Sequence, residues 1–445
     1  MKIDELKQKK VALYGFGREG QAVLAAIRQR LPNLPITILN DSPLSEIPEN
    51  VEILTGDDVA MALQTFDVVI KSPGISAYRP DIMAAKTTGV IFTSSTRLWF
   101  AENQDKTTIC VTGTKGKSTT SSLIAHLLRE QGLKVNLGGN LGIPLWELPT
   151  DPAPDIWVIE LSSYQTSDFD AQPTIRVLLN LFPEHLDWHG DVDTYFNDKT
   201  RLFTAKTDSL SILNANDENT RLYLHDLKNT IYFNDLKTIH FDQKNIFDGK
   251  SWLFNANSLK LAGEHNLSNL CAALSVVKAL NIDPQKCQNA LSTFSSLPHR
   301  LHILGEKQNI TYIDDSISTT PQSALAAVKS FDNQWITLLV GGYERGLDWE
   351  EVAHFVMQRP IQTIITMPNN GARIFEFLSH FKEKNDPTAD FPNLLMANDL
   401  QEAVMLAKKA TPPNGMIILS PGAPSYGCFK DFQERGRAFA QFCGF

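Results

Sequence analysis

The segment Thr107-Thr-Ile-Cys-Val-Thr-Gly113-Thr-Lys-Gly-Lys-Ser-Thr119 decides the fold. Its apolar start predicts a buried β-strand over 107–113, and residues 119–130 predict a helix. Glycines between a strand and a helix let backbone N–H groups face phosphates, and the helix N-terminus adds partial positive charge. We therefore expect a nucleotide-binding loop made of Gly113, Thr114, Lys115, Gly116, Lys117, Ser118 and Thr119.

Two side-chain types in this loop indicate ATP chemistry. Lys117 can reach the terminal phosphates, and Ser118 or Thr119 can offer a hydroxyl to Mg²⁺. The loop is shorter than the common G-x-x-x-x-G-K-[ST] form, and a glycine-rich turn with a surface lysine is the alternative. The order of strand, loop and helix favours an ATP-dependent enzyme.

Length and composition place the chain among globular α/β proteins. Its 445 residues predict several domains, and 42% hydrophobic with 20% charged residues is ordinary. A net charge of -9 without a long basic run disfavours nucleic acid as a partner. No apolar run suits a membrane span, the charged start does not read as a signal peptide, and five scattered cysteines suit a reducing compartment. We expect a cytoplasmic monomer.

Alternating apolar runs and helical stretches predict three α/β domains. Strands are expected over 11–15, 36–40 and 67–72, and a helix over 18–30. Polar residues 101–106 and the segment Pro298-His299-Arg300 predict boundaries. The expected domains are a Rossmann-like domain at 1–102, a central P-loop ATPase domain at 103–297 and a Rossmann-like C-terminal domain at 298–445. Residues 208–262 are less regular.

A second glycine-rich turn opens the first predicted domain. Gly15-Phe-Gly17-Arg18-Glu-Gly20 follows a strand, and Asn40 and Asp41 end the next strand. This pattern fits a dinucleotide fingerprint, although any ligand with a pyrophosphate could use it. A tight turn without a ligand is the alternative. Ser72-Pro73-Gly74 closes a neighbouring strand and could face the same ligand.

Three further positions are candidates for metal binding or structure. Glu160 ends a strand where α/β sheets place ligands, and its carboxylate suits Mg²⁺ or a simple strand cap. His185, Asp187 and His189 resemble a metal cluster on paper, although a lone histidine is more often packed or exposed. Lys199 falls in a helical stretch, and its local sequence does not distinguish it from a solvated lysine.

Several motifs taken together identify a family. They are Gly113-Thr-Lys-Gly-Lys-Ser-Thr119, Gly139-Asn140, Glu160-Leu-Ser-Ser, Glu184-His185-Leu-Asp187, Gly263-Glu-His-Asn266 and Pro298-His299-Arg300. In this order, over essentially the whole chain, they resemble the Mur ligases of peptidoglycan precursor synthesis. The resemblance is greatest to the branch that joins glutamate to UDP-N-acetylmuramoyl-L-alanine.

The resemblance implies ATP, two Mg²⁺ ions and specific site residues. Ser118 and Glu160 would bind one Mg²⁺, and His185 with a carbamylated Lys199 would bind the second. Adenine, ribose and phosphates would contact Asn266, Asn269, Arg300 and Asp315. The UDP-sugar substrate would contact Gly17, Arg18, Asn40, Asp41, Ser72, Pro73, Gly74 and Asn140. The incoming glutamate would contact Thr319, Arg345, Ser425 and Phe432. Lys117, Glu160, His185 and Lys199 would serve the reaction directly.

The sequence departs from this family in the predicted glutamate site. Members commonly have Asp-Ser-Lys-Ala-Thr-Asn, where this chain has Asp315-Ser-Ile317-Ser-Thr-Thr320, so a charged contact is absent. Arg345 stands where a lysine is usual, and its planar fork binds carboxylates differently. These changes make D- and L-glutamate near-equal hypotheses, with a slight preference for the usual D-glutamate.

Other classes of protein use some of the same features. An NAD-dependent dehydrogenase would explain the first-domain glycines but would leave the Gly113 loop, Glu160 and His185 without a role. A regulatory nucleotide switch would hydrolyse nucleotide without an amino acid. Folylpolyglutamate synthase shares the central motifs, but the UDP-type first domain argues against it.

Overall fold

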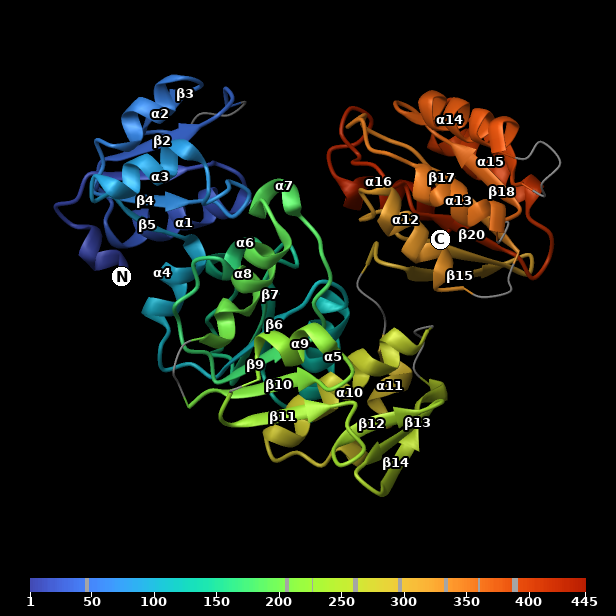
Figure 1. Cartoon of the computed structure of the whole chain (residues 1–445), viewed down its shortest axis with the longest axis horizontal. Coiled ribbons are helices and arrows are strands. Elements are labelled where there is room, and N and C mark those ends of the chain that lie inside the picture. Colours follow the sequence, from blue (N-terminus) through green and yellow to red (C-terminus); the bar gives the residue numbers. More distant parts are fainter. Residues whose placement is uncertain are drawn as a thin grey trace. The chain divides into compact units, whose positions relative to one another are not determined.

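The chain forms two compact units. The computed structural model describes residues 1–44, 48–204, 208–225, 227–258, 263–294, 298–331, 335–358, 361–385 and 391–445. The first unit contains Met1–Leu259 and Glu264–Phe294, and the second contains Lys260–Gly263 and Ser295–Phe445. Figure 1 shows the first unit in blue to yellow and most of the second in orange and red.

The first sheet of unit 1 is parallel and has the strand order β3-β2-β1-β4-β5. Its strands are β1 (Val11–Tyr14), β2 (Ile36–Asn40), β3 (Glu52–Thr55), β4 (Val68–Lys71) and β5 (Ile91–Thr93). The helices between and after them are α1 (Arg18–Arg30), α2 (Asp58–Leu63), α3 (Pro80–Thr87) and α4 (Ser95–Glu102). β1 and β4 are buried along their whole length, as expected for central strands between helices.

The second sheet of unit 1 is also parallel, with the order β11-β10-β9-β6-β8-β7. It contains β6 (Thr108–Thr112), β7 (Val135–Gly139), β8 (Ile156–Glu160), β9 (Ile175–Leu178), β10 (Leu210–Asn214) and β11 (Thr230–Phe233). The associated helices are α5 (Lys117–Glu130), α6 (Ser163–Thr166), α7 (Leu186–His189), α8 (Val192–Thr204), α9 (Glu218–Tyr223), α10 (Glu264–Ala279) and α11 (Ala290–Thr293).

An antiparallel three-stranded sheet extends from the second sheet. It consists of β12 (Ile239–Asp242), β13 (Asn245–Asp248) and β14 (Ser251–Asn255), and β12 packs against α10. The less regular stretch 208–262 of the sequence therefore contains two parallel strands followed by this small sheet. The strands in this stretch are short and contain interspersed polar residues, which explains why the hydrophobic pattern of 208–262 was weak.

Unit 2 has one mixed sheet with the order β15-β16-β20-β17-β18-β19. Only the pair of β15 (His302–Lys307) and β16 (Ile310–Asp314) is antiparallel; β17 (Ile336–Val340), β18 (Thr363–Thr366), β19 (Asn393–Met396) and β20 (Met416–Leu419) are parallel. Its helices are α12 (Pro321–Lys329), α13 (Glu350–Gln358), α14 (Gly371–Asn385), α15 (Leu400–Ala410) and α16 (Phe432–Cys443).

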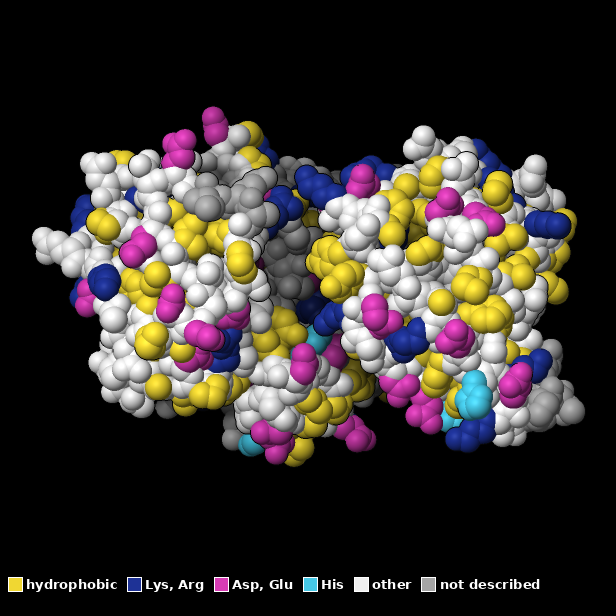
Figure 2. Space-filling view, turned by 90° about the horizontal axis from the view of Figure 1, so that it is seen from above, with side chains coloured by type: hydrophobic (Ala, Val, Ile, Leu, Met, Phe, Trp, Pro, Cys, Tyr) yellow, Lys and Arg dark blue, Asp and Glu magenta, His cyan; other side chains and the backbone are white. Residues whose placement is uncertain are grey.

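The observed elements confirm the α/β fold with Rossmann-like parallel sheets. The predicted helix at 18–30 has the same bounds as α1, and the predicted strand at 107–113 is β6. Each of the three predicted domains contains its own large sheet, while the first two lie in one compact unit. Basic and acidic side chains are interspersed over the face in Figure 2. Among the described residues, no helix combines the length and apolar character of a membrane span.

The turn between β6 and α5 depends on two glycines. Gly113 has φ +151° and Gly116 has φ +86°, conformations that L side chains rarely adopt. A Cβ on Gly116 would lie 2.5 Å from Oδ1 of Asn269 on α10, and one on Gly113 would lie 2.9 Å from the Leu179 Cβ. The chain can therefore turn directly from the buried strand into α5 only with glycine here.

Gly116→Ala should destabilise unit 1 more than Gly132→Ala does. Gly132 has the same φ of +86° but open space around its Cβ position, so it reports backbone strain alone, about 1–2 kcal/mol. Gly116→Ala adds the collision with Asn269, worth about 1–3 kcal/mol more. Urea unfolding of both variants measures the difference. Equal stabilities would show that Asn269 does not restrict the loop.

Candidate active site

Two lysines converge on one carbonyl oxygen at the start of the phosphate loop. The Gly113 oxygen accepts hydrogen bonds from Lys117 Nζ at 2.9 Å and from Lys199 Nζ at 3.1 Å. Lys117 Nζ also donates to the Thr114 oxygen at 2.9 Å. Lys117 begins α5, whereas Lys199 comes from α8, so the fold brings the helical lysine to the loop.

Lys199 is a buried amine rather than a solvated helix lysine. Its side chain is 1% exposed, and Nζ lies 5.1 Å from the centre of the Tyr195 ring. Burial, reinforced by the positive charge of Lys117, lowers the pKa of Lys199 well below its ordinary value. A lowered pKa increases the fraction of Lys199 present as the neutral, nucleophilic amine. Only the packing of α8 against the loop reveals this.

Two buried oxygens near the loop remain without partners. Glu160 ends β8 and is 1% exposed; its Oε1 accepts a hydrogen bond from Asn140 Nδ2 at 2.7 Å. Among the described residues, Oε2 of Glu160 and Oγ of Ser118 have no hydrogen-bond partner. Buried oxygens normally have a hydrogen-bond partner, so these two need an explanation such as a bound ion or water. A carboxylate and a hydroxyl beside a phosphate loop are ligands that Mg²⁺ prefers, so these residues fit such an ion.

His185 lies at the mouth of the same site. It precedes α7 in a left-handed conformation, φ +57°, and its ring centre is 5.1 Å from that of Tyr164. Burial lowers the pKa of His185, which keeps the imidazole neutral and able to bind a metal. Neighbouring Glu184 pairs with Lys115, and this ammonium outweighs burial and lowers the pKa of Glu184.

The apparent cluster of His185, Asp187 and His189 is not a metal site. Both ring nitrogens of His189 are already engaged, Nδ1 with Asp198 Oδ2 at 2.7 Å and Nε2 with Ser163 Oγ at 3.0 Å. Within the described ranges, no group of three or more His, Cys, Asp or Glu side chains could hold an ion. The spacing of the three residues suggested a cluster, but α7 directs the His189 ring into the interior, toward Asp198 and Ser163.

The predicted adenine-site residues of unit 1 lie beside the loop. Asn269 Nδ2 donates to Asn266 Oδ1 at 3.1 Å, and both residues are buried in the first turns of α10. Asn269 is the residue that a Cβ on Gly116 would strike. The loop and α10 are therefore neighbours, while the contact of Asn266 and Asn269 with the nucleotide stays a prediction.

A cavity of about 540 Å³ gathers all the residues predicted to bind the UDP-sugar substrate. These are Gly17, Arg18, Asn40, Asp41, Ser72, Pro73, Gly74 and Asn140. Sequence reasoning missed Glu19, Ser162, Tyr164 and Gln165, which also line it. Gln165 Nε2 donates to Glu19 Oε1 at 2.8 Å, so helices α1 and α6 meet at the cavity. Burial raises the pKa of Glu19 to about 6.

Two cavity residues, Arg18 and Asp41, have partners within the chain. Arg18 forms an ion pair with Glu147 at 2.7 Å. Asp41 accepts hydrogen bonds from the Tyr14 hydroxyl at 2.8 Å and from Arg79 at 2.7 Å. These contacts fix the rim of the cavity, and Arg18 would have to exchange a partner to bind a phosphate.

Arg300 and Asp315 lie together in unit 2. Asp315 Oδ1 accepts from the Leu301 backbone N–H at 3.1 Å, and Oδ2 accepts from Ser420 Oγ at 2.7 Å. Asp315 is 6% exposed, and burial raises its pKa to about 7. The positive charge of Arg300 lowers the pKa of Asp315 and so opposes the effect of burial. Among the described residues, Nε of Arg300 has no hydrogen-bond partner.

The predicted glutamate-site residues follow neighbouring strands of unit 2. Thr319 follows β16, Arg345 follows β17 and Ser425 follows β20, strands that are adjacent in the sheet. Gly341 N donates to the Pro421 oxygen and Tyr343 N to the Pro424 oxygen, each at 2.8 Å, so the loops pack together. Phe432 begins α16, and its ring centre lies 6.0 Å from that of His299.

Sequence reasoning missed Arg435, which ties these loops together. Its side chain is 2% exposed; Nε donates to Ser316 Oγ at 3.0 Å, and Nη2 donates to the oxygens of Ser316 and Ala423. A buried arginine in an amphipathic helix has no sequence signal, because arginine normally marks an exposed face.

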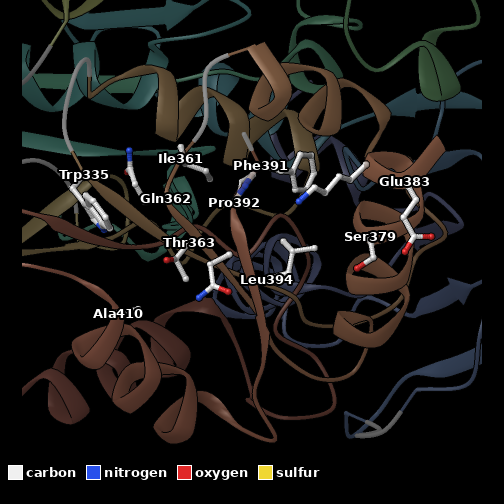
Figure 3. Close-up of a pocket in the computed structure, with 12 residues that line it drawn as sticks. Trp335, Ile361, Gln362, Thr363, Ser379, Glu383, Phe391, Pro392, Leu394 and Ala410 are labelled. Atoms are coloured by element: carbon white, nitrogen blue, oxygen red, sulfur yellow. The ribbon is translucent and has the colours of Figure 1, made fainter. Parts of the chain in front are cut away.

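A second cavity, of about 910 Å³, lies at the amino-terminal ends of β17, β18 and β19 (Figure 3). Its lining includes Trp335 before β17, Gln362 before β18 and Asn393 at the start of β19. The predicted glutamate-site residues instead follow the carboxyl ends of their strands. The larger cavity is therefore not the predicted glutamate site.

Asp315→Asn should stabilise unit 2 increasingly as the pH rises. The pKa of Asp315 is about 7 in the folded state, against an ordinary value of 3.8. The stability contributed by its protonated form is therefore lost as the pH rises between these values. The amide stays neutral, so its melting temperature minus that of wild type should increase from about pH 5 to about pH 8. Exposed Asp105→Asn is the control. A constant difference would refute the raised pKa.

Comparisons with known proteins agree with this arrangement. Residues 111–277 match the Mur ligase middle domain. The chain is 43% identical to the UDP-N-acetylmuramoyl-L-alanine--L-glutamate ligase of Xanthomonas axonopodis pv. citri, over 100% of this chain and 97% of that protein. It is 36% identical to the enzyme of the same name from Salinispora tropica, over 99% of this chain and 98% of that protein.

Solved structures share the fold at lower identity. MurC from Thermotoga maritima superposes with a TM-score of 0.59 at 19% identity, covering 98% of this chain and 99% of that one. MurF from Acinetobacter baumannii gives a TM-score of 0.60 at 18% identity, and the match covers 97% of this chain and 90% of that one. The full-length match to curated relatives is decisive: the chain belongs to the Mur ligase family.

Proposed function

We propose that the chain joins L-glutamate to UDP-N-acetylmuramoyl-L-alanine with the hydrolysis of ATP to ADP and phosphate. The position of Asn140 carries this proposal. Asn140 lines the 540 Å³ cavity and donates to Glu160 at 2.7 Å. A substrate in the cavity therefore has a direct route to the phosphate loop, and the first-domain glycines and the loop serve one reaction. A dehydrogenase would use only the first of these features.

The reaction proceeds in two displacements. A carboxylate oxygen of the UDP-muramoyl-L-alanine attacks the γ-phosphorus of ATP, and ADP leaves. The amine of glutamate then attacks the acyl carbon, phosphate leaves, and the amine gives up a proton. Lys117 at the start of α5 can balance negative charge on the transferring phosphoryl group. Lys199 and Glu160 are each 1% exposed, and exclusion of water from their surroundings would protect the acyl phosphate from hydrolysis.

Two Mg²⁺ ions fit the residues of the site. Ser118 and Glu160 would hold one, and His185 with Lys199 would hold the other. When bound, the ions supply charge neutralisation on phosphate oxygens. Lys199 would serve as a carbamate, because its ammonium would repel a cation and the nitrogen of its neutral amine is a poorer ligand for Mg²⁺ than an anionic carbamate oxygen. Its lowered pKa favours the neutral amine from which a carbamate forms.

The acceptor is proposed to be L-glutamate rather than the D-glutamate that the family's usual pattern favoured. The full-length relatives named above carry L-glutamate in their names. Ile317 and Arg345 support the same choice, since both depart from the D-glutamate pattern within the predicted acceptor loops. Arg345 follows Glu344, which Arg373 holds through Nε at 2.6 Å, so the loop that presents the guanidinium is anchored.

Phosphate release should require UDP-N-acetylmuramoyl-L-alanine and should be at least about tenfold faster with L-glutamate than with D-glutamate. A coupled phosphate assay with each enantiomer measures the ratio, and mass spectrometry identifies the dipeptide product. Faster release with D-glutamate would reverse the stereochemical assignment. Release without any amino acid would favour a nucleotide switch, and no release with either enantiomer would exclude the ligase.

Lys199→Ala should reduce turnover at least about a hundredfold, because it removes a predicted metal ligand. Short carboxylic acids that fit the vacated space should restore part of the activity by replacing the carbamate oxygens. Lys228→Ala, a change on another lysine of unit 1, is the control. Wild-type turnover in Lys199→Ala would remove this residue from the site.

A further inference from the structure

The His189 imidazole lies between three helices at the centre of unit 1. It belongs to α7, its Nδ1 is 2.7 Å from Asp198 Oδ2 of α8, and its Nε2 is 3.0 Å from Ser163 Oγ of α6. A neutral ring that donates from Nδ1 to the carboxylate and accepts at Nε2 from the hydroxyl satisfies both contacts. One side chain thus fixes the mutual positions of three helices.

This Ser-His-Asp arrangement does not form a nucleophilic triad. Ser163, His189 and Asp198 are 2%, 2% and 5% exposed, so a substrate cannot reach the serine hydroxyl. A nucleophile must meet its substrate at the surface of a cavity. The three residues therefore act through the elements that carry them.

Each of these helices adjoins one residue of the predicted metal sites. Glu160 ends the strand that leads into α6, and His185 directly precedes α7. Lys199 follows Asp198 in α8. The His189 backbone N–H also donates to the His185 oxygen at 3.1 Å. Movement of His189 would therefore change the positions of Glu160, His185 and Lys199 relative to one another.

Tyr78 connects this network to the substrate cavity. Its hydroxyl donates to Asp198 Oδ1 at 2.7 Å, so the two carboxylate oxygens hold Tyr78 and His189 respectively. The loop that bears Tyr78 begins at Ser72-Pro73-Gly74, which lines the cavity. Ser76 of the same loop donates to the Trp188 oxygen of α7 at 2.7 Å. The cavity loop thus contacts both α7 and α8.

We propose that His189 is a positioning residue for the divalent-cation sites and that Tyr78 couples these sites to occupation of the UDP-sugar cavity. Rigid outer contacts set the geometry of metal ligands and are worth about 10–100-fold in metal affinity. The coupling to substrate rests on the proposed function, whereas the effect of His189 on cation binding does not require it.

The test measures Mn²⁺ binding by electron paramagnetic resonance in the full-length protein with ADP, with and without UDP-N-acetylmuramoyl-L-alanine. His189→Phe should weaken Mn²⁺ binding about 10–100-fold. His189→Asn should recover part of this loss, because its amide can still donate to Asp198. In wild type the UDP substrate should tighten Mn²⁺ binding, and Tyr78→Phe should abolish that enhancement while leaving binding without substrate within about twofold.

Tyr223→Phe is a matched control for Tyr78→Phe. The Tyr223 hydroxyl donates to Asp193 Oδ1, also a tyrosine–aspartate contact to α8, but at its exposed N-terminal end. In Tyr223→Phe the UDP substrate should still tighten Mn²⁺ binding as it does in wild type. In steady-state kinetics with Mg²⁺, His189→Phe should lower kcat more than it raises KM for ATP, as expected of a positioning residue.

The outcomes separate this inference from the proposed function. Wild-type Mn²⁺ affinity in folded His189→Phe would overturn the positioning role, and an enhancement preserved in Tyr78→Phe would overturn the coupling. If His189→Phe fails to fold, Mn²⁺ binding to His189→Asn tests the positioning role instead. Wild-type Mn²⁺ affinity in His189→Asn would then overturn that role. If wild type binds Mn²⁺ but makes no product, the proposed function fails while the His189 comparison still holds.

Discussion

The site depends on the hydrogen bonds that the Gly113 carbonyl oxygen accepts from two lysines. Lys117 and Lys199 lie at 2.9 and 3.1 Å from this atom, although they come from different helices. Two amines this close cannot easily both carry a charge in a buried place. Lys199 is the more buried of the two, and burial together with the charge of Lys117 lowers the pKa of Lys199. The same close approach requires glycine at 113 and 116, because a Cβ at either position would strike a neighbouring residue.

Much of the fold could be predicted because strands and loops leave local signals. The β6 segment, the glycines that follow it and the helix α5 are adjacent in sequence, so their arrangement follows from hydrophobic pattern and turn chemistry. The residues expected at the UDP-sugar site likewise line one cavity, because they follow the carboxyl ends of parallel strands, which meet at one edge of a sheet. Their contact with that substrate stays a prediction.

The features that could not be predicted arise from tertiary packing. Lys199 has the sequence environment of an ordinary helix lysine, and only the approach of α8 to the loop buries it. His189 was grouped with His185 and Asp187 because of its spacing, yet its ring turns inward toward Asp198 and Ser163. The burial of Arg435 likewise could not be predicted from its local sequence. Side-chain direction on a helix depends on what packs against each face, which local sequence does not record.

Acceptor stereochemistry can change in this fold without altering the activation chemistry. The residues proposed to activate the carboxylate, Lys117, Glu160 and Lys199, belong to unit 1. Those that depart from the common pattern, Ile317 and Arg345, belong to unit 2. D- and L-glutamate present the same amine and the same two carboxylates in mirror-related positions. Selection between them depends on where the cations that face the carboxylates lie. Under the proposed assignment, Ile317 replaces one such cation, and Arg345 would offer a planar, two-pronged one on a loop anchored through Glu344 and Arg373.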